Sequence, residues 1–394
     1  FDHYVLFCNE NLPAYLFMGV IVSLFVGLII SAEDIYRDRK ILKREAFLKL
    51  NKISYLKSKL IFLFILSAIQ SFLFVIIGNW VLGIEGMIFL YWIILFSTFS
   101  FANVVGLLIS SLFNSIVVIY ILVPLFIVPQ ILLSGTMVQY DKLNAKVLND
   151  QNVPFVGDIM ASRWAYEALV VAQFEKNKYQ KHYFNFDKQD SYARFNVLFL
   201  IPELKEAKNN LIDGVRDGTI SEYENDFNLL KNELKNLTNF KPFPKLKDIR
   251  FEDLTMQDLS RIEKYINDLN NESIEIVDHV SYAKDSITHA IISKLGDIDS
   301  YNEFKNVNSN KSINDLVLKR QTFKPFVKRN NRIIRKIEPI YHIPESRIGR
   351  AHFFASEKRI GSFSLSSISF NIVVLWVMTL IFCIFLIIIF YRKF

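Results

Sequence analysis

Residues 86–140 read GMIFLYWIILFSTFSFANVVGLLISSLFNSIVVIYILVPLFIVPQILLSGTMVQY and contain no Asp, Glu, Lys or Arg. An apolar α-helix of about 20 residues crosses the ~30 Å hydrocarbon core of a bilayer. The run is too long for one crossing, and the polar residues within 110–115 divide it. The sequence therefore predicts two transmembrane helices here, over about 86–110 and about 115–135.

Further apolar stretches lie on both sides of this run. Residues 60–84 and 360–391 also lack charged side chains, whereas residues 182–358 are charged and rich in Asn. Because 52% of the residues are hydrophobic and yet 22% are charged, one part of the chain faces lipid and another faces water. The pattern predicts an α-helical polytopic membrane protein with one sizeable water-exposed domain. Three more transmembrane helices are expected, over about 13–32, 59–79 and 366–390.

The basic residues predict how the chain is oriented in the membrane. Residues 33–59 carry nine Lys and Arg, the connection 80–85 carries none, and the last span ends at Arg392 and Lys393. Short basic loops beside membrane spans stay in the cytoplasm. We therefore expect residues 33–59 in the cytoplasm, residues 136–365 outside it, and the protein in the inner membrane of a bacterium.

The stretch 318–359 is rich in Lys and Arg although it lies in the part assigned to the outside. Long exported domains escape the rule for short loops, so the orientation is kept. The stretch is either a solvated face of a folded domain or a surface for lipid phosphates, and both interpretations stay open. Cys8 and Cys383 indicate neither a disulfide framework nor a metal site, and the His residues show no metal-binding spacing.

The cytoplasmic loop 33–59 mixes apolar and charged residues at loosely helical spacing, which indicates an amphipathic helix. A basic amphipathic helix beside a membrane commonly lies on anionic lipid. The alternative is a coupling helix, which carries force from a cytoplasmic motor domain into the spans. The spacing alone does not decide between these two interpretations.

Residues 160–174, MASRWAYEALVVAQF, place aromatic and charged side chains beyond the fourth span. Trp and Tyr favour the membrane interface because their rings are apolar while their polar groups need water. Arg163 and Glu167 lie four residues apart and can pair along one helix turn. The segment predicts a short helix in the outer interface or a surface helix of the outer domain, and the apolar residues 168–172 favour the first.

Together these segments resemble the membrane half of ABC exporters of the G subfamily, which have the type-2 ABC permease fold. In that family a Ser-Gly-like corner precedes an outer re-entrant helix with the pattern Arg-(Tyr/Trp)-Ala-x-Glu-Ala-Leu. Here residues 134–135 are Ser-Gly and residues 163–169 are RWAYEAL. The long segment before the last span departs from the family, whose loop there is short or moderate. The resemblance assigns the outer gate to Arg163, Trp164, Tyr166 and Glu167.

The resemblance also implies a coupling role for the loop 33–59. The family's coupling segment has an acidic start, an Arg-x-x-Phe-like motif and a Tyr-x-x-x-Lys approach to the next span. Lys59 completes the last of these motifs here. The resemblance assigns coupling to the ATPase to Glu33, Asp34, Arg44, Phe47 and Tyr55. It implies no catalytic residue and no metal ligand in this chain.

No G-x-x-x-x-G-K-[ST] phosphate loop occurs in the sequence, so this chain cannot hydrolyse ATP. No cofactor is expected in it, while ATP and Mg are expected on an ABC ATPase domain upstream of Phe1, in the same polypeptide. The other expected partners are a second copy of the permease, the lipid bilayer and envelope proteins that meet residues 182–358, with no nucleic acid.

The expected parts are an extracytoplasmic loop 1–12, four spans with the coupling segment in 13–135, an outer loop with the re-entrant helix in 136–181, an extracytoplasmic, mostly helical domain in 182–365, and the last span with a cytoplasmic tail in 366–394.

The resemblance implies export of a lipid-like, amphipathic or other hydrophobic substrate, out of the cytoplasm or the inner leaflet, by alternating access. Polar residues within spans often face the protein interior and are candidates for the substrate cavity. They equally form simple hydrogen bonds between helices. The candidates are Gln70, Thr98, Asn103, Asn114 and Gln130.

Two other functions stay open. A mechanotransmitting ABC protein would move no substrate and would act on envelope partners through its outer domain. A membrane scaffold would work without any ATPase.

Overall fold

The computed structural model describes residues 4–45, 51–140, 152–237, 242–243, 249–322 and 324–393. The chain forms two compact units, each with its own packing. Unit 1 comprises 1–181, 302–317 and 342–394, and unit 2 comprises 182–301 and 318–341. Phe47, one of the predicted coupling residues, lies outside the described residues.

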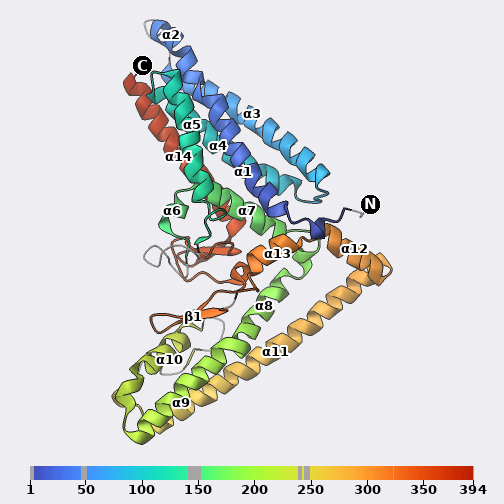
Figure 1. Ribbon diagram of the computed structural model, residues 1–394, viewed down its shortest axis with the longest axis vertical. Helices are drawn as coiled ribbons and strands as arrows, with labels where there is room; N and C mark the ends of the chain where they lie inside the picture. The colour runs from blue at the N-terminus through green and yellow to red at the C-terminus, as the bar shows by residue number, and fades with distance from the viewer. Residues whose placement is uncertain are drawn as a thin grey trace. The chain divides into compact units, whose positions relative to one another are not determined.

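Unit 1 contains the apolar helices that the hydropathy pattern predicts. They lie side by side in Figure 1, and they are α1 (Leu12–Ala32), α3 (Lys52–Val81), α4 (Ile88–Leu112), α5 (Ile116–Leu132) and α14 (Ser367–Lys393). Among the described residues, four helical stretches are long and apolar enough to cross a membrane, and α5 is a shorter apolar helix with Pro124 and Pro129 inside it. The prediction of an α-helical polytopic membrane protein is confirmed.

The start of α3 differs from the prediction, because the helix begins at Lys52 rather than near residue 59. The side chain of Asn51 caps it by accepting hydrogen bonds from the backbone N–H groups of Ile53 and Ser54, at 3.1 and 3.3 Å. An Asn in this position satisfies donors that have no partner in the first turn. Hydropathy marks only the lipid-facing part of a helix, so this capped, basic turn was not predicted.

Small residues bring α1 and α4 close together. A methyl group added to Gly27 would lie 2.7 Å from the Cβ of Ala102 and 3.0 Å from the carbonyl oxygen of Phe99. In lipid, helices associate through such close backbone packing rather than through the hydrophobic effect. The fully buried Leu24 and Leu28 flank this contact. The helix α4 is therefore the centre of the bundle, in contact with α1, α3 and α14.

The rest of unit 1 is made of short elements. The hairpin of β3 and β4 is antiparallel, with Lys358 opposite Leu365, and it leads directly into α14. Most of α12 and α13 belongs to the segment 302–317 of unit 1, which unit 2 precedes and follows in the sequence. The elements are the 3-10 turn Leu6–Cys8, α2 (Asp34–Glu45), α6 (Phe155–Asp158), α7 (Ala161–Glu175), the 3-10 turn Gln180–His182, α12 (Ile298–Asn308), α13 (Lys311–Leu318), β3 (Glu357–Ile360) and β4 (Phe363–Ser366).

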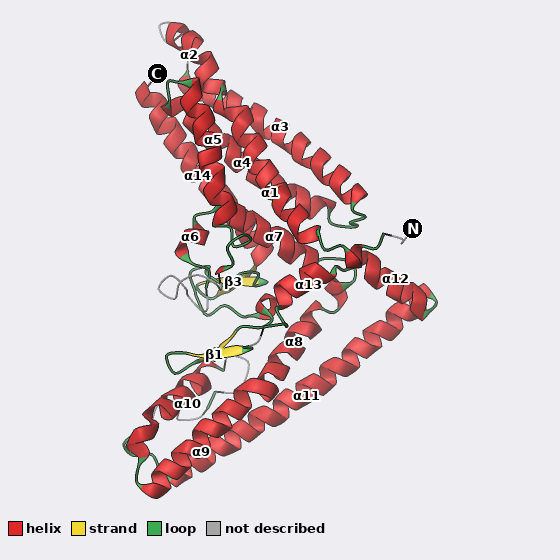
Figure 2. Ribbon diagram, in the orientation of Figure 1, coloured by secondary structure: helices red, strands yellow, loops and turns green. Residues whose placement is uncertain are grey.

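Unit 2 is mostly helical, as predicted for this part of the chain (Figure 2). The long helix α11 packs against α8 and α9, which a short π-helix joins into one rod. A capping box between Thr255 and Asp258 starts α11. The elements are α8 (Phe184–Phe195), the π-helix Asn196–Leu200, α9 (Ile201–Asp217), the 3-10 turn Ile220–Tyr223, α10 (Glu224–Asn236), α11 (Met256–Leu295), β1 (Phe326–Lys328), β2 (Ile333–Arg335) and the 3-10 turn Pro339–Tyr341.

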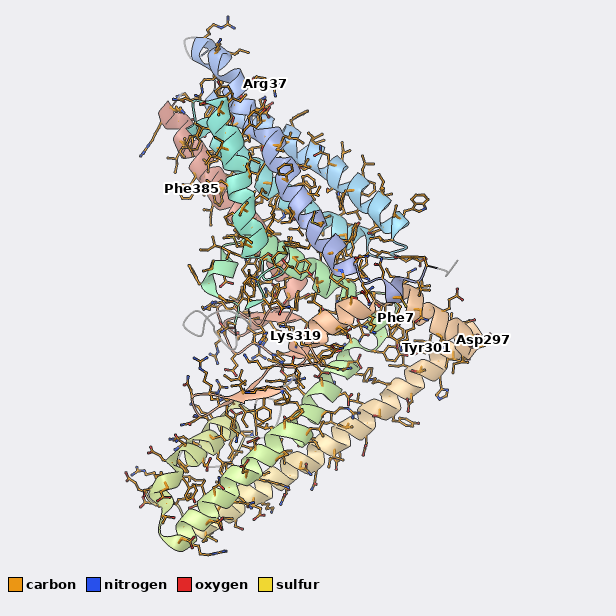
Figure 3. All side chains as sticks on the ribbon, in the orientation of Figure 1. Phe7, Arg37, Asp297, Tyr301, Lys319 and Phe385 are labelled. Atoms are coloured by element: carbon orange, nitrogen blue, oxygen red, sulfur yellow. The ribbon has the colours of Figure 1, made fainter. Side chains whose placement is uncertain are left out.

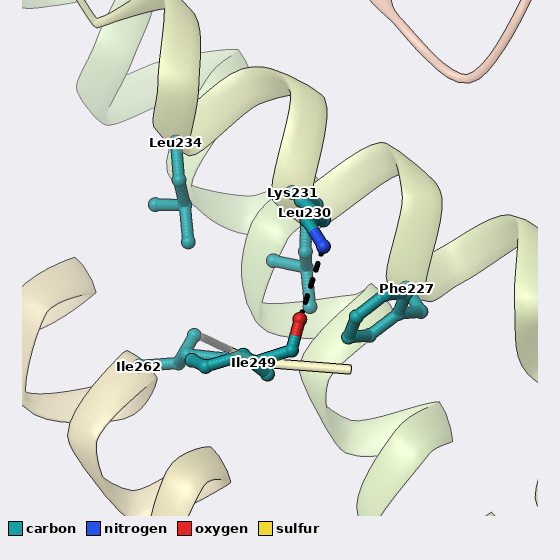
Figure 4. A pocket seen from close by; sticks show the side chains of 6 residues that line it. All are labelled: Phe227, Leu230, Lys231, Leu234, Ile249 and Ile262. Carbon is teal, nitrogen blue, oxygen red and sulfur yellow. Dashed lines mark hydrogen bonds between the residues drawn. The ribbon is translucent and has the colours of Figure 1, made fainter. Parts of the chain in front are cut away.

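The core of unit 2 lies between α9, α10 and α11. Leu204, Leu230 and Ile266 are buried in it almost completely. A small apolar pocket opens beside this core, where the ammonium group of Lys231 donates to the carbonyl oxygen of Ile249 at 3.0 Å (Figure 4). The lysine stem thus covers apolar surface while its charged end reaches a polar atom. Unit 2 has an apolar core of its own.

Leu204→Ala should loosen unit 2 locally. Truncating a fully buried Leu costs about 2–5 kcal/mol through lost burial and the cavity that remains. Hydrogen exchange followed by mass spectrometry should show faster exchange in α9 and α11. Leu198→Ala is the matched control, because Leu198 is 60% exposed. Equal effects of the two substitutions would contradict the core described here.

Candidate functional site

The start of α2 is joined to α3 by a cluster of charged and phenolic side chains. The ammonium group of Lys59 lies 2.9 Å from a carboxylate oxygen of Asp38 and 3.7 Å from one of Asp34. The hydroxyl of Tyr55 donates to the same oxygen of Asp38 at 2.8 Å. Two of the predicted coupling residues, Asp34 and Tyr55, therefore meet in one cluster. This cluster fixes the beginning of α2 to the first turns of α3.

Arg39 joins α2 to the turn that follows α4. Its guanidinium group donates to the carbonyl oxygen of Phe113 at 2.8 Å and to that of Ser110 at 3.3 Å, and it also contacts the side chain of Asn114. From the end of α14, Lys393 donates to the carbonyl oxygens of Ser111 and Leu112 at 2.8 and 2.7 Å. Carbonyls in the last turn of a helix lack partners within that helix and attract cations. Two basic side chains from different helices thus meet the end of α4.

The remaining predicted coupling residues lie apart from one another. The carboxylate of Glu33 accepts a hydrogen bond from the hydroxyl of Tyr120 in α5. Arg44 is exposed near the end of α2. The α2 region, residues 33–45, is bonded to α5 through Glu33, to α3 through Asp38 and to the end of α4 through Arg39.

The predicted helix at RWAYEAL is present as α7, and it is buried on all sides. Every residue from Ala161 to Phe174 is buried, and α7 packs against α1, α4, α5 and α14. The ring of Tyr166 meets that of Phe17 edge-on, with 5.4 Å between the ring centroids. The polar face of α7 is therefore turned toward protein rather than toward water.

Glu167 is the centre of a buried polar cluster. Its carboxylate accepts a hydrogen bond from the ammonium group of Lys358 at 2.6 Å and one from the amide of Asn371 at 2.9 Å. The backbone N–H of Phe354 donates to its other oxygen at 3.3 Å. Lys358 donates in turn to the side-chain oxygen of Asn371 at 2.7 Å. Glu167, Lys358 and Asn371 are each 0% exposed.

Arg163 contributes a second cation to this cluster. Its guanidinium group lies 3.5 Å from Glu167 and 3.5 Å from Asp158, and it stacks 3.8 Å from the ring centre of Trp164. Asp158 also pairs with Arg350 at 3.0 Å. The predicted ion pair between Arg163 and Glu167 is therefore present as part of a larger network.

Burial and charge act against each other on the ionisation of this cluster. Burial opposes the ionised form of Glu167, but Arg163 and Lys358 together hold the pKa of its carboxyl below the ordinary value. Burial lowers the pKa of Lys358 to about 7, although the attraction of Glu167 opposes that change. Charged groups of this kind persist without water only when hydrogen bonds and opposite charges surround them.

The predicted cavity residues do not come together. Thr98 donates to the carbonyl of Ile94 in its own helix, and Gln70 is half-buried on α3. Asn103 donates to Ser67 of α3 at 2.6 Å. The side chain of Gln130 accepts from the backbone N–H of Ser162 at 3.0 Å, so it caps the start of α7. Together with Asn114, which contacts Arg39, three of the five make hydrogen bonds between elements.

Residues 4–174 match the family model of the ABC-2 type transporter. The chain carries an ABC-2 type transporter membrane domain. Comparison with curated proteins and with solved structures gave no match. An ABC-2 type domain is the permease component of an ABC transporter, lies in a membrane and associates with an ABC ATPase. The match includes nearly all of α7, so the predicted family resemblance is confirmed for this part of the chain.

Two important residues of the buried cluster lie beyond the matched segment 4–174 and were missed in the sequence. Lys358 belongs to the basic stretch 318–359, but the prediction of a solvated face is wrong for this residue, which is completely buried. Asn371 was hidden in the apolar run 360–391. A signal was available in that run, because Asn371 is its only amide side chain and such groups in a span require a partner. Arg39 was also missed, since nothing in the spacing distinguishes it from its basic neighbours.

Glu167→Gln should destabilise the protein much more than Glu85→Gln. Breaking a buried ion pair costs about 3–5 kcal/mol, because one charge stays buried without compensation. Glu85 pairs with Lys178, but their side chains are 56% and 44% exposed, and such pairs contribute about 0–1 kcal/mol. The melting temperature of the purified protein should fall clearly for the first variant and hardly for the second. Similar melting temperatures would show that the cluster around Glu167 is not a buried ion pair.

Proposed function

We propose that this chain is the permease part of an ATP-driven exporter that works by alternating access. One observation carries the proposal: the α2 region is bonded through side chains to α3, α4 and α5. A displacement of α2 is therefore transmitted to three spans rather than absorbed by a flexible loop. A coupling helix needs this property, and a helix that only rests on lipid does not.

The proposed motor is an ABC ATPase that docks on the segment 33–59 and holds ATP and Mg. Such a segment suits this role because, among its described residues, Arg37, Lys40 and Arg44 are exposed, while Lys59 and Asp38 pair at the start of α3. Arg37 is exposed on α2 and is free to meet a partner (Figure 3). A second copy of the permease would complete the transporter. The ATPase would then drive the two copies between inward-open and outward-open states.

The proposed substrate is lipid-like, amphipathic or otherwise hydrophobic. Most of the predicted cavity residues are used in hydrogen bonds within or between helices. Large apolar side chains dominate the exposed faces of the spans, for example Phe62 on α3. Phe385 on α14 is another example (Figure 3). Polar substrates need convergent polar groups in a pocket, whereas an apolar substrate does not. This chemistry favours a substrate that comes from the membrane.

Arg39→Ala should separate ATP hydrolysis from transport. The substitution removes the bonds between α2 and the end of α4, so motion of α2 no longer reaches that span. We expect ATP hydrolysis by the complex with its ATPase to continue, while the ATP-dependent movement of fluorescent phospholipids in proteoliposomes falls. Arg392→Ala is the matched control, because Arg392 is an exposed arginine that lies outside the proposed docking segment 33–59. Unchanged transport in the Arg39 variant would count against the coupling role of α2.

We propose that unit 2 lies outside the cytoplasm and that the protein sits in a bacterial inner membrane. The basic loop 33–59 and the basic end at Arg392 and Lys393 support this orientation. Protease added to right-side-out membranes should cut within unit 2 and leave residues 33–59 intact. Inverted membranes should give the opposite pattern. Cleavage of 33–59 from outside would overturn the orientation.

Mechanotransmission is the second candidate function, and the separate core of unit 2 favours it. A unit with its own core can respond to the spans as a rigid body and act on envelope partners. The phospholipid assay discriminates between the two functions. A complex that hydrolyses ATP, moves none of a panel of phospholipids and hydrophobic dyes, and changes the protease sensitivity of unit 2 with ATP would favour mechanotransmission.

A further inference from the structure

Lys358 occupies an unusual position in unit 1. It lies on β3, in the segment that leads from the second unit into α14, yet its side chain is 0% exposed. Buried lysines are rare unless they are paired. Neighbouring residues of the same segment, including Phe354 and Ala355, are also buried. This part of the chain therefore runs through the interior of unit 1.

The ammonium group of Lys358 connects three elements. It donates to Glu167 of α7 at 2.6 Å and to Asn371 of α14 at 2.7 Å, and it lies 4.4 Å from the ring centre of Trp164. Asn371 closes the set by donating to Glu167 and to the carbonyl oxygen of Trp164. The ammonium group thus has two oxygen acceptors and an aromatic face as surroundings. We call this set of Glu167, Lys358, Asn371 and Trp164 the buried junction.

The backbone just before β3 also holds this segment against α7 and α14. Phe354 has a φ of 70°, a left-handed conformation that is strained for a bulky residue. In this conformation its N–H points to Glu167, and its ring meets that of Tyr166. The N–H of Ser367, the first residue of α14, donates to the carbonyl of Ser356 at 2.8 Å. The segment is therefore held against both α7 and α14.

A relative movement of α7 and α14 would break this junction. It would leave Lys358 without its carboxylate in a dry environment, and Glu167 with only Arg163 of its own helix, which is strongly unfavourable for these charges. The contacts of α7 with α1 carry no such penalty, because Tyr166 and Phe17 meet there through apolar rings. Motion of α7 against α1 is therefore easier than motion against α14.

We propose that Lys358 is a positioning residue that joins α7, the β3–β4 hairpin and the adjoining end of α14 into one rigid body, which moves as a whole during the transport cycle. The movement during a transport cycle rests on the proposed function. The rigid body depends only on the contacts of the buried junction, so it can be tested without any transport.

The first test follows Trp164 as a reporter inside the junction. In the full chain, Trp80, Trp92 and Trp376 are replaced by Phe, and the complex with its ABC ATPase is placed in nanodiscs. We expect the emission of Trp164 and its protection from iodide to stay the same without nucleotide and with a non-hydrolysable ATP analogue. A red shift or increased quenching with the analogue would overturn the proposal, because water would then enter the junction. This readout needs no substrate, so it stands even if no export is found.

The second test compares variants at Lys358 with a matched control. Lys358→Met should make Trp164 accessible to iodide and lower ATP-dependent phospholipid transport at least about ten-fold at equal abundance in the membrane. Lys178→Met is the control, because Lys178 also pairs with a glutamate but is exposed, and it should behave like the parent protein. Equal effects of the two substitutions would overturn the proposal.

A double variant covers the case in which Lys358→Met does not accumulate. Glu167→Met combined with Lys358→Met removes both charges of this pair and keeps apolar packing, while Asp158 still pairs with Arg163. Such a double replacement is often tolerated where one missing partner is not. We expect abundance and the protection of Trp164 to return toward the parent values. A double variant as defective as the single one would show that Lys358 does not act through Glu167, and the proposal would fail.

Discussion

The structure of unit 1 depends on the compensation of one buried carboxylate, that of Glu167. A carboxylate without water must have an opposite charge and hydrogen-bond donors around it. Here the donors come from positions far away in the sequence, at Phe354, Lys358 and Asn371. Beside the local cation Arg163, the environment of this carboxylate is therefore completed by the part of the chain that follows unit 2 in the sequence. The charge of Glu167 thus joins α7, which precedes unit 2 in the sequence, to Lys358 and Asn371, which follow it.

The helix α4 relates this junction to the opposite end of the bundle. Near its start, the hydroxyl of Tyr91 donates to the side chain of Gln173 on α7 at 2.5 Å. Just beyond its last turn, the carbonyl of Phe113 accepts a hydrogen bond from Arg39 of the α2 region. The helix α4 is also packed closely against α1 through small residues. Side-chain contacts at its two ends therefore connect the α2 region with α7.

The sequence was sufficient for those features that depend on local chemistry. Uncharged runs predicted the apolar helices because lipid requires about 20 such residues in a row, and RWAYEAL predicted α7 together with its ion pair. The rest depends on tertiary contacts. A lysine in a basic stretch looks solvated until a strand turns it inward, as happens at Lys358. Polar residues in spans, such as Asn103 and Gln130, were open to two interpretations, a substrate cavity or hydrogen bonds between helices, because their partners on other helices are invisible in one sequence.

The buried junction also explains how the bundle accommodates a large insertion before its last span. The chain leaves unit 1 after α7, belongs to it again at 302–317, and returns to it at residue 342 before it reaches Lys358. Because Lys358 is bonded to α7, the first exit from unit 1 and the last return to it are held by the same buried junction. Domain insertions are tolerated where the two ends of the insertion are held close together. The hydrogen bonds of the buried junction therefore stabilise the packing of α7 and α14 on both sides of the long intervening chain.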